Sequence, residues 1–449
     1  MHFNFPDDFL WGAASSACQI EAACGVDGKQ FTGHDFYSRT NTANPNQETP
    51  DMAADFYHRY ANDIAHMHTL GLKSFRFSIS WARIFSDIGS KVNQAGVDYY
   101  DRVIDCLADA GIEPFFDLFH CDLPMFVIDR GGAKNPLFVD WFADYAKTCF
   151  TLFGDRVKLW STVNEPCINI YGAYAEGMNA PFETDFKGGL LASHNMLLAH
   201  FKAVKVYRSL NLGGKIGAVN YFQPVYPKTL AERDVAAADR YRAFQSGWWL
   251  DTMMKGAYPS NLTVMPYVAE HMPEGYDREL AETFEPMDFL GINYYGPYHA
   301  EYIDDGRMFY KAYKDSSRPQ DDYGFVLYPS GLFDSMVYLK EAYGNPEIYI
   351  TENGTAAYRG KDLQEDLEDN YRIDYLREHI REVARCLKAG TDIRGYYPWT
   401  IMDTWEGYGC TGGYRYVFGF IRIDPETLER TPRKSYYFYQ EVIQKGTVL

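Results

Sequence analysis

The chain has 449 residues, 46% of them apolar and 17% aromatic, which is enough to bury a large core and excludes a disordered polypeptide. Its 43 Lys and Arg residues against 61 Asp and Glu residues give a net charge of −18, and such a surface repels nucleic-acid phosphates and anionic lipids. We therefore expect neither a nucleic acid nor a membrane as a partner, and no apolar run approaches the roughly 20 residues that span a bilayer.

The N-terminal stretch MHFNFPDDFLWGAASS has no basic segment followed by an apolar one, so it does not have the pattern of a secretory signal. Eight cysteines are scattered without a C-x-x-C pair or zinc-type spacing, which favours reduced thiols in a cytoplasmic protein. The close pair His66 and His68 falls inside a predicted helix, far from any strand end. We expect neither a metal nor a cofactor.

Short β-type runs alternate with longer amphipathic stretches along the whole chain, with no linker or repeat between them. The helical stretches include residues 55–71, 96–112 and 371–390, and the first has a Gly where a helix should stop. The predicted strands, in chain order, are Phe9–Ala13, Ser74–Ile79, Glu113–Phe119, Val157–Val163, Lys215–Asn220, Met287–Asn293, Glu347–Thr351 and Ile393–Trp399.

Eight strands alternating with helices predict an α/β protein, either a closed (β/α)8 (TIM) barrel or a doubly wound sheet. Polar or aromatic side chains at the ends of the strands favour the barrel, in which all the strand C-termini meet at the face where barrel enzymes keep their active sites. We therefore expect a single barrel domain over residues 1–449. The strand-end residues are Gln19, His120, Asn164, Glu165, Asn293, Tyr294, Tyr295, Glu352, Asn353 and Trp399.

Two of these strand ends carry a Glu in the same setting, in TVNEP around Glu165 and in YITENG around Glu352. Two carboxyl groups across a barrel mouth are what hydrolysis of a glycosidic bond requires: one donates a proton to the leaving oxygen, and the other attacks or stabilises the anomeric carbon. The alternative is that each Glu caps the following helix, where a negative charge suits the helix dipole.

Five motifs in this order resemble glycoside hydrolase family 1: FLWGAASSACQIEAA (9–23), FRFSISWARI (75–84), STVNEP (161–166), FLGINYY (289–295) and YITENG (349–354). The resemblance covers residue 5 to about residue 440. That family contains retaining β-glucosidases, β-galactosidases and 6-phospho-β-glycosidases. It implies a single barrel and hydrolysis of a small-molecule β-glucoside, or a closely related β-glycoside, by double displacement through a covalent glycosyl-enzyme.

The resemblance assigns Glu165 as general acid/base and Glu352 as nucleophile. Arg76 would keep the Glu352 carboxylate ionised, and Tyr295 would orient it through a hydrogen bond. Asn293 also belongs to the expected catalytic set. The expected substrate-binding set is Gln19, His120, Asn164, Trp399, Trp405, Glu406 and Tyr408: Asn164 would hold the sugar 2-hydroxyl, Trp399 would form the stacking floor, and Glu406 would accept two hydroxyls.

Several positions depart from the family pattern. Cys18 stands where a Tyr is usual, Cys121 and Cys167 stand where Trp is usual, and Gly407 replaces the Trp after the glycone Glu. The lost aromatic walls indicate either a pocket for an unusual substrate or one refilled by the longer loop after Gly407.

Three alternatives stay open beside a β-glucosidase. A 6-phospho-β-glucosidase usually has Ser at the glycone Glu, so Glu406 opposes it, although Arg415 could bind an anion. A non-catalytic glycan-binding barrel would be favoured by the loss of either Glu, and neither is lost. Transglycosylation uses the same intermediate. A homo-oligomer is possible for a member of this family.

Overall fold

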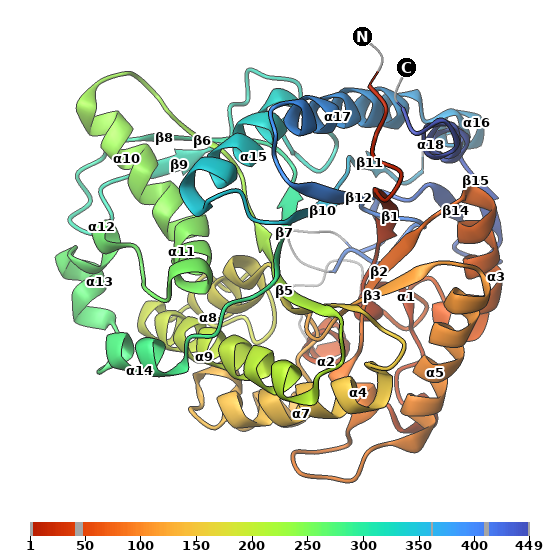
Figure 1. Cartoon of the computed structure of the whole chain (residues 1–449), viewed down its shortest axis with the longest axis horizontal. Helices are drawn as coiled ribbons and strands as arrows, with labels where there is room; N and C mark the ends of the chain where they lie inside the picture. The colour runs from red at the N-terminus through yellow and green to blue at the C-terminus, as the bar shows by residue number, and fades with distance from the viewer. Residues whose placement is uncertain (1–2, 41–47, 361, 408–412, 448–449) are drawn as a thin grey trace.

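The computed structural model describes residues 3–40, 48–360, 362–407 and 413–447. Eight parallel strands close into a barrel in the order β1-β12-β10-β7-β5-β4-β3-β2, which confirms the predicted fold (Figure 1). The eight predicted strands are confirmed, with ends shifted by one or two residues. The barrel strands are β1 Leu10–Ala14, β2 Ser74–Ser78, β3 Glu113–Asp117, β4 Leu159–Asn164, β5 Lys215–Tyr221, β7 Phe289–Tyr294, β10 Ile348–Asn353 and β12 Ile393–Pro398.

The barrel is filled by side chains, as a layered barrel core requires. Phe115, Phe289, Tyr349 and Tyr397 come from four different strands and meet inside it, with ring centroids 5.0–6.5 Å apart. Each of these rings is buried. This aromatic layer supports the strands from within, so the strand ends above it are fixed in place.

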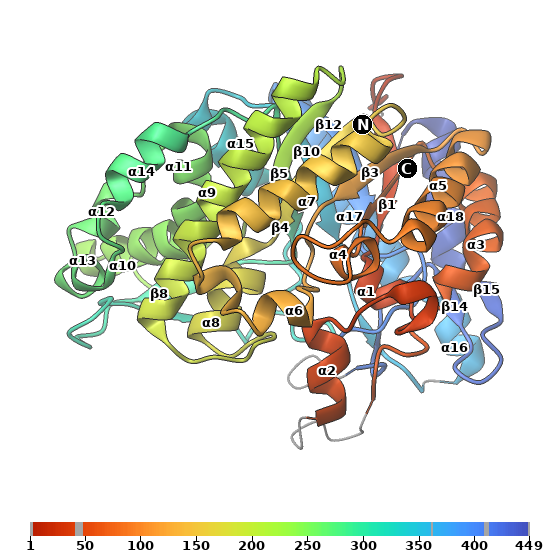
Figure 2. The same cartoon turned by 90° about the horizontal axis from the view of Figure 1, so that it is seen from below.

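Helices surround the strands on the outside (Figures 1 and 2). The predicted helices 55–71, 96–112 and 371–390 are confirmed as α3, α5 and α17, and α3 stops at Gly71 in the left-handed conformation (φ 91°) that suits a helix C-cap. The longer helices are α2 Gly33–Thr40, α3 Phe56–Leu70, α5 Gln94–Asp109, α7 Phe138–Phe153, α9 Phe186–Leu210, α10 Glu232–Arg242, α11 Trp248–Lys255, α14 Tyr276–Thr283, α15 Ser330–Tyr343, α17 Asn370–Lys388 and α18 Lys434–Lys445.

Short elements fill the connections and were not predicted, because two to six residues carry little periodicity. Three small sheets are formed by β6 Val225–Pro227, β8 Tyr298–Glu301 and β9 Lys311–Tyr313; by β11 Ala357–Tyr358 and β13 Tyr416–Val417; and by β14 Ile421–Ile423 and β15 Arg430–Pro432. The short helices are α1 Ala17–Ile20, α4 Trp81–Ile84, α6 Met125–Ile128, α8 Ala173–Ala175, α12 Ser260–Thr263, α13 Pro266–His271 and α16 Leu363–Glu368. A π-helix, Cys167–Gly172, follows β4.

The strand pairing becomes irregular at the carboxyl ends of β4 and β10. The register between β4 and β5 shifts between Ser161 and Asn164, and that between β10 and β7 shifts between Ile350 and Glu352. Such irregularities re-aim side chains and are common next to active sites. Among the described residues, no helix combines the length and apolar character needed to cross a membrane.

Candidate active site

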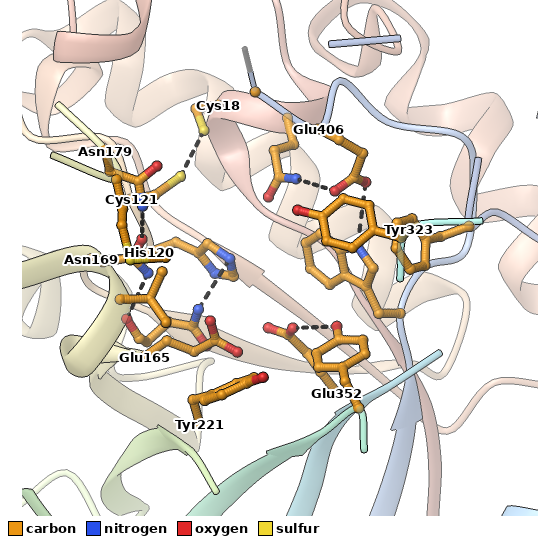
Figure 3. A pocket seen from close by; sticks show the side chains of 18 of the residues that line it. Cys18, His120, Cys121, Glu165, Asn169, Asn179, Tyr221, Tyr323, Glu352 and Glu406 are labelled. Carbon is orange, nitrogen blue, oxygen red and sulfur yellow. Dashed lines mark hydrogen bonds between the residues drawn. The ribbon is translucent and has the colours of Figure 1, made fainter. Parts of the chain in front are cut away.

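One cavity of about 350 Å³ opens at the carboxyl ends of the barrel strands (Figure 3). It gathers residues that are far apart in the chain, which is what a closed barrel predicts. The predicted residues that line it are Gln19, His120, Asn164, Glu165, Tyr295, Glu352, Trp399, Trp405 and Glu406. Arg76 and Asn293 contact this set from the barrel interior, and Tyr408 lies outside the described residues.

Glu352 is held by two donors. Arg76 Nη1 donates to its Oε1 at 2.8 Å, and the Tyr295 hydroxyl donates to its Oε2 at 2.7 Å. Glu352 is the next-to-last residue of β10, whereas the predicted strand ended one residue before it. Both oxygens of this carboxylate therefore accept a hydrogen bond, and one of the two donors is a buried cation.

Arg76 is itself fully buried, and besides Glu352 it contacts Asp117 and Asn164. Its Nη2 lies 2.6 Å from the Asp117 carboxylate and donates to Asn164 Oδ1 at 2.6 Å. Burial opposes its charge, but the carboxylates of Asp117 and Glu352 outweigh burial and raise the pKa of Arg76. The cation is therefore permanent and fixed in direction.

Glu165 has a different environment from Glu352. It directly follows β4, its backbone is left-handed (φ 44°), and its N–H donates to the Val219 carbonyl at 2.8 Å. Loss of contact with bulk water and the negative charge of Glu352 raise the pKa of Glu165 well above its ordinary value, against the opposing hydrogen bond from Asn293. A left-handed non-glycine residue at a strand end stores strain, which is common where a side chain must point into a site.

Asn293 and Asn164 connect the two carboxyl groups. Asn293 Nδ2 donates to Glu165 Oε1 at 2.8 Å and to Asn164 Oδ1 at 3.1 Å, and Asn164 accepts in turn from Arg76. The Thr351 hydroxyl fixes Asn293 by donating to its Oδ1 at 2.7 Å. The network thus contacts Glu165 through one neutral amide and Glu352 through a cation, so the two carboxyls have different electrostatic surroundings.

A second group of polar side chains surrounds Glu406. Gln19 Nε2 and the Trp399 indole N–H each donate to its carboxylate at 3.4 Å, and the Thr404 hydroxyl donates to it as well. Burial raises the pKa of Glu406 to about 7, against the opposing hydrogen bonds of Thr404 and Trp399. His120 lies stacked on Trp399 with ring centroids 5.6 Å apart. These polar groups, with the indole face, suit a polyhydroxylated ring.

Three of the four positions that depart from the family pattern lie at this end of the cavity. Cys18, Cys121 and Gly407 line it, and the Cys18 and Cys121 sulfurs are 3.0 Å apart. Cys167 is buried at the start of the π-helix after Glu165 and does not contribute to the lining formed by the described residues. Trp405 is fully buried and presents its ring edge-on to His34, 5.5 Å away.

Sequence reasoning missed the opposite wall of the cavity. It is formed mainly by residues that follow β4 or lie near the ends of β5 and β7 and in the segment before α15. Tyr221, as the last residue of β5, carried the same strand-end signal as the predicted residues, whereas the others lie in connections without a motif. The missed residues are His34, Ile168, Asn169, Met178, Asn179, Tyr221, Tyr298, Lys314, Tyr323, Phe325 and Phe418.

A parallel barrel with two carboxyl groups in different surroundings at its mouth is the arrangement of glycoside hydrolases. The sequence model of Glycosyl hydrolase family 1 matches residues 1–447. Beta-glucosidase A of Acetivibrio thermocellus is 36% identical over 446 residues, 99% of each chain, and the 6-phospho-beta-glucosidase GmuD of Bacillus subtilis is 34% identical over 98% of each chain. A solved family 1 β-glucosidase from Thermotoga maritima, in complex with isofagomine lactam, superposes with a TM-score of 0.94 at 35% identity over the whole of both chains. The chain belongs to glycosyl hydrolase family 1 and is a retaining glycoside hydrolase.

Proposed function

We propose that the enzyme hydrolyses β-glucosides with Glu352 as nucleophile and Glu165 as general acid/base. The observation that carries the proposal is the different surroundings of the two carboxyls: Arg76 and Tyr295 donate hydrogen bonds to Glu352, whereas burial and the negative charge of Glu352 raise the pKa of Glu165. Relatives named beta-glucosidase cover the whole chain, which supports the β-glucoside as substrate.

In the first step the Glu352 carboxylate attacks the anomeric carbon, and the leaving oxygen takes the proton from Glu165. The product is a glycosyl ester of Glu352 plus the free aglycone. Esterification removes the charge of Glu352, so the pKa of Glu165 falls and its carboxylate can accept a proton from water. That water attacks the anomeric carbon, releases the sugar with retained configuration and restores both carboxyl groups.

For the sugar, we propose that Asn164 binds the 2-hydroxyl, Trp399 supports the ring face, and Gln19, His120 and Glu406 bind the remaining hydroxyls. Trp405 supports this wall from behind. The Glu406 carboxylate opposes a 6-phosphate, and Arg415 is exposed with its guanidinium over the rings of Tyr358 and Tyr416. These contacts favour an unphosphorylated glucoside over a 6-phosphoglucoside.

A panel of aryl β-glycosides (gluco, galacto, fuco, xylo and 6-phosphogluco) tests this proposal with one enzyme preparation. We expect the highest kcat/KM for the glucoside, and NMR should detect the β-anomer of glucose before mutarotation. A 6-phosphoglucoside preferred over the glucoside would overturn the substrate assignment. No turnover of any member would favour a glycan-binding barrel.

Residues 1–449 are proposed to form one domain, which is supported by a hydrophobic cluster that runs from Phe5 to Val442. The seven described cysteines are free thiols, which supports the proposed cytoplasmic location. Homo-oligomerisation is proposed on the family resemblance alone.

A further inference from the structure

Two thiols and an imidazole converge at the glycone end of the cavity. Cys18 lies in α1, Cys121 lies just after β3, and His34 lies near the start of α2, the red helix in the lower part of Figure 2. One ligand atom from each lies within 4.8 Å of the other two. All three residues line the cavity, and Figure 3 shows the two thiols directed toward each other.

His34 is the member of this group that ordinary packing does not explain. Its side chain is 5% exposed, and within the described residues neither ring nitrogen has a hydrogen-bond partner. A neutral imidazole has one ring nitrogen with a free lone pair, which can bind a metal ion. Buried polar atoms in proteins are almost always satisfied, so these nitrogens call for a partner.

We propose that Cys18, His34 and Cys121 bind a thiophilic d10 cation, with Zn²⁺ as the representative ion. Two thiolates and one neutral imidazole form a known type of zinc ligand set that leaves the fourth tetrahedral position open. Here that position faces the cavity, because all three ligands line it. The site goes beyond the hydrolytic machinery, since neither Glu165 nor Glu352 takes part in it.

The geometry needs only a small adjustment. Zinc–sulfur bonds of about 2.3 Å in a tetrahedral site place two sulfurs about 3.8 Å apart. The Cys18 and Cys121 sulfurs are 3.0 Å apart, so they must separate by somewhat less than 1 Å. Rotation about the Cα–Cβ bonds of two cysteines supplies a movement of this size.

The competing explanation is a disulfide between Cys18 and Cys121. Its sulfurs would have to approach to about 2.05 Å, a movement of similar size in the opposite direction. The sulfur separation therefore does not decide between the two. His34 does: a disulfide leaves both of its buried nitrogens without a partner, whereas a metal ion uses one of them as a ligand.

Binding exchanges protons for the ion. The cation displaces a proton from each thiol to solvent and becomes bound to two thiolates and the neutral imidazole. No oxidant or reductant takes part.

Occupancy should affect sugar binding, because Cys18 and Cys121 are covalent neighbours of Gln19 and His120. An ion held by the two thiols would therefore lie beside these two side chains in the cavity. The ion also adds positive charge near Glu406, which lies close enough to Cys121 to influence its pKa. We therefore expect bound zinc to raise KM for a glucoside.

Cobalt titration of the reduced, chelator-treated full-length enzyme tests the site. Co²⁺ substitutes for Zn²⁺, and thiolate ligation gives an intense near-ultraviolet charge-transfer band. We expect one equivalent per chain and displacement of the band by Zn²⁺. Cys18→Ser, Cys121→Ser and His34→Asn should each weaken binding by at least ~10-fold, the loss that even outer-shell partners of a metal produce.

Cys106→Ser is the matched control, because this cysteine lies on α5, is partly exposed and is outside the cluster. It should leave the band and the affinity unchanged. No charge-transfer band, or unchanged affinity in Cys18→Ser, would overturn the proposal. A mass lower by two hydrogens in enzyme prepared without reductant, lost in Cys18→Ser, would assign the pair to a disulfide instead.

Kinetics give a second readout. Zinc should raise KM of the parent enzyme for an aryl glucoside, with reversal by a chelator, and should leave KM of Cys18→Ser unchanged relative to its own metal-free value. Equal inhibition of both enzymes by zinc would show that the inhibiting ion binds elsewhere. It would contradict the proposal that the Cys18–His34–Cys121 site causes the inhibition. The cobalt titration needs no turnover, so failure of the proposed glucosidase activity stays distinguishable from failure of the metal site.

Discussion

At the scale of single residues, the two catalytic candidates differ in what surrounds them. Glu352 has a cation and a phenol on its oxygens, whereas Glu165 has one amide. Two chemically identical side chains thereby have different surroundings, which is the usual way in which one site obtains both an acid and a nucleophile at one pH.

Replacing the proposed nucleophile is the most direct test of this assignment. Glu352→Gly should lower kcat for an aryl β-glucoside by at least ~1000-fold, because the covalent intermediate can no longer form. Azide should restore part of the activity by occupying the freed space and should give the inverted glycosyl azide, identified by NMR. Turnover at the parent rate would remove Glu352 from the role.

The effect of removing the proposed acid on the rate should depend on the leaving group of the substrate. Glu165→Ala should slow glucosides of poor leaving groups far more than activated aryl glucosides, because only the former need a proton on the leaving oxygen. The measurement is kcat/KM against leaving-group pKa. Equal losses for all substrates would contradict the acid role.

The pH dependence follows from the raised pKa of Glu165. The acid must be protonated in the free enzyme, so kcat/KM should fall as pH rises through that pKa, which lies well above the ordinary value for Glu. Asn293 donates to the ionised form and lowers this pKa, so Asn293→Ala should move the alkaline limb to higher pH. Asn220→Ala, a buried amide in β5, is the control and should leave the limb in place.

At the scale of elements, an ion cluster holds the segment that carries Glu406. Arg433, buried just before α18, donates to both Asp403 oxygens at 2.8 and 3.0 Å and to Asp366 at 2.9 Å. Burial opposes the Asp403 charge, but the guanidiniums of Arg433 and Arg359 outweigh it and lower the pKa of Asp403. Arg433, directly before α18, thereby fixes Asp403 in the loop after β12, three residues before Glu406.

Removing the Arg433 guanidinium should lower the stability of the folded protein. Arg433→Met leaves the Asp403 charge buried without its main partner, and we expect a loss of ~3–5 kcal/mol in the free energy of unfolding, measured by denaturant titration. KM for the glucoside should rise as Glu406 loses its support. Arg377→Met, which breaks a partly exposed pair with Asp374, is the control and should change little. Equal effects of the two variants would remove the special role of Arg433.

The same pair has a pH signature. The folded-state pKa of Asp403 is depressed, so its contribution to stability is present above the ordinary Asp pKa and is lost as pH falls through the folded value. The free energy of unfolding of Arg433→Met should therefore no longer show this loss as pH falls.

At the scale of the whole molecule, the net charge of −18 acts on any charged substrate before contact is made. A neutral glucoside feels no such field, so its kcat/KM should stay constant as salt rises. A 6-phosphoglucoside is repelled, and screening should raise its kcat/KM. Initial rates over a range of salt concentrations check both statements, and a fall for the phosphorylated substrate would indicate a cationic site that overrides the global charge.

The sequence by itself determined the barrel, its eight strands and both catalytic candidates. Strand runs such as Lys215–Tyr221 are apolar enough to be found locally, and Glu165 and Glu352 each follow or end such a run. A barrel brings strand ends to one face by its topology, so their meeting could be predicted without coordinates.

Only the tertiary structure decided what lies around those residues. These surroundings include the bridging position of Asn293, the cavity wall with Phe325 and Tyr323, and the approach of His34 to Cys18 and Cys121. They depend on segments up to hundreds of residues apart. Spacing along the chain carried no zinc pattern, because Cys18, His34 and Cys121 come from three separate segments. Local patterns report the backbone's own periodicity, whereas contacts between connections are fixed only when the whole chain packs.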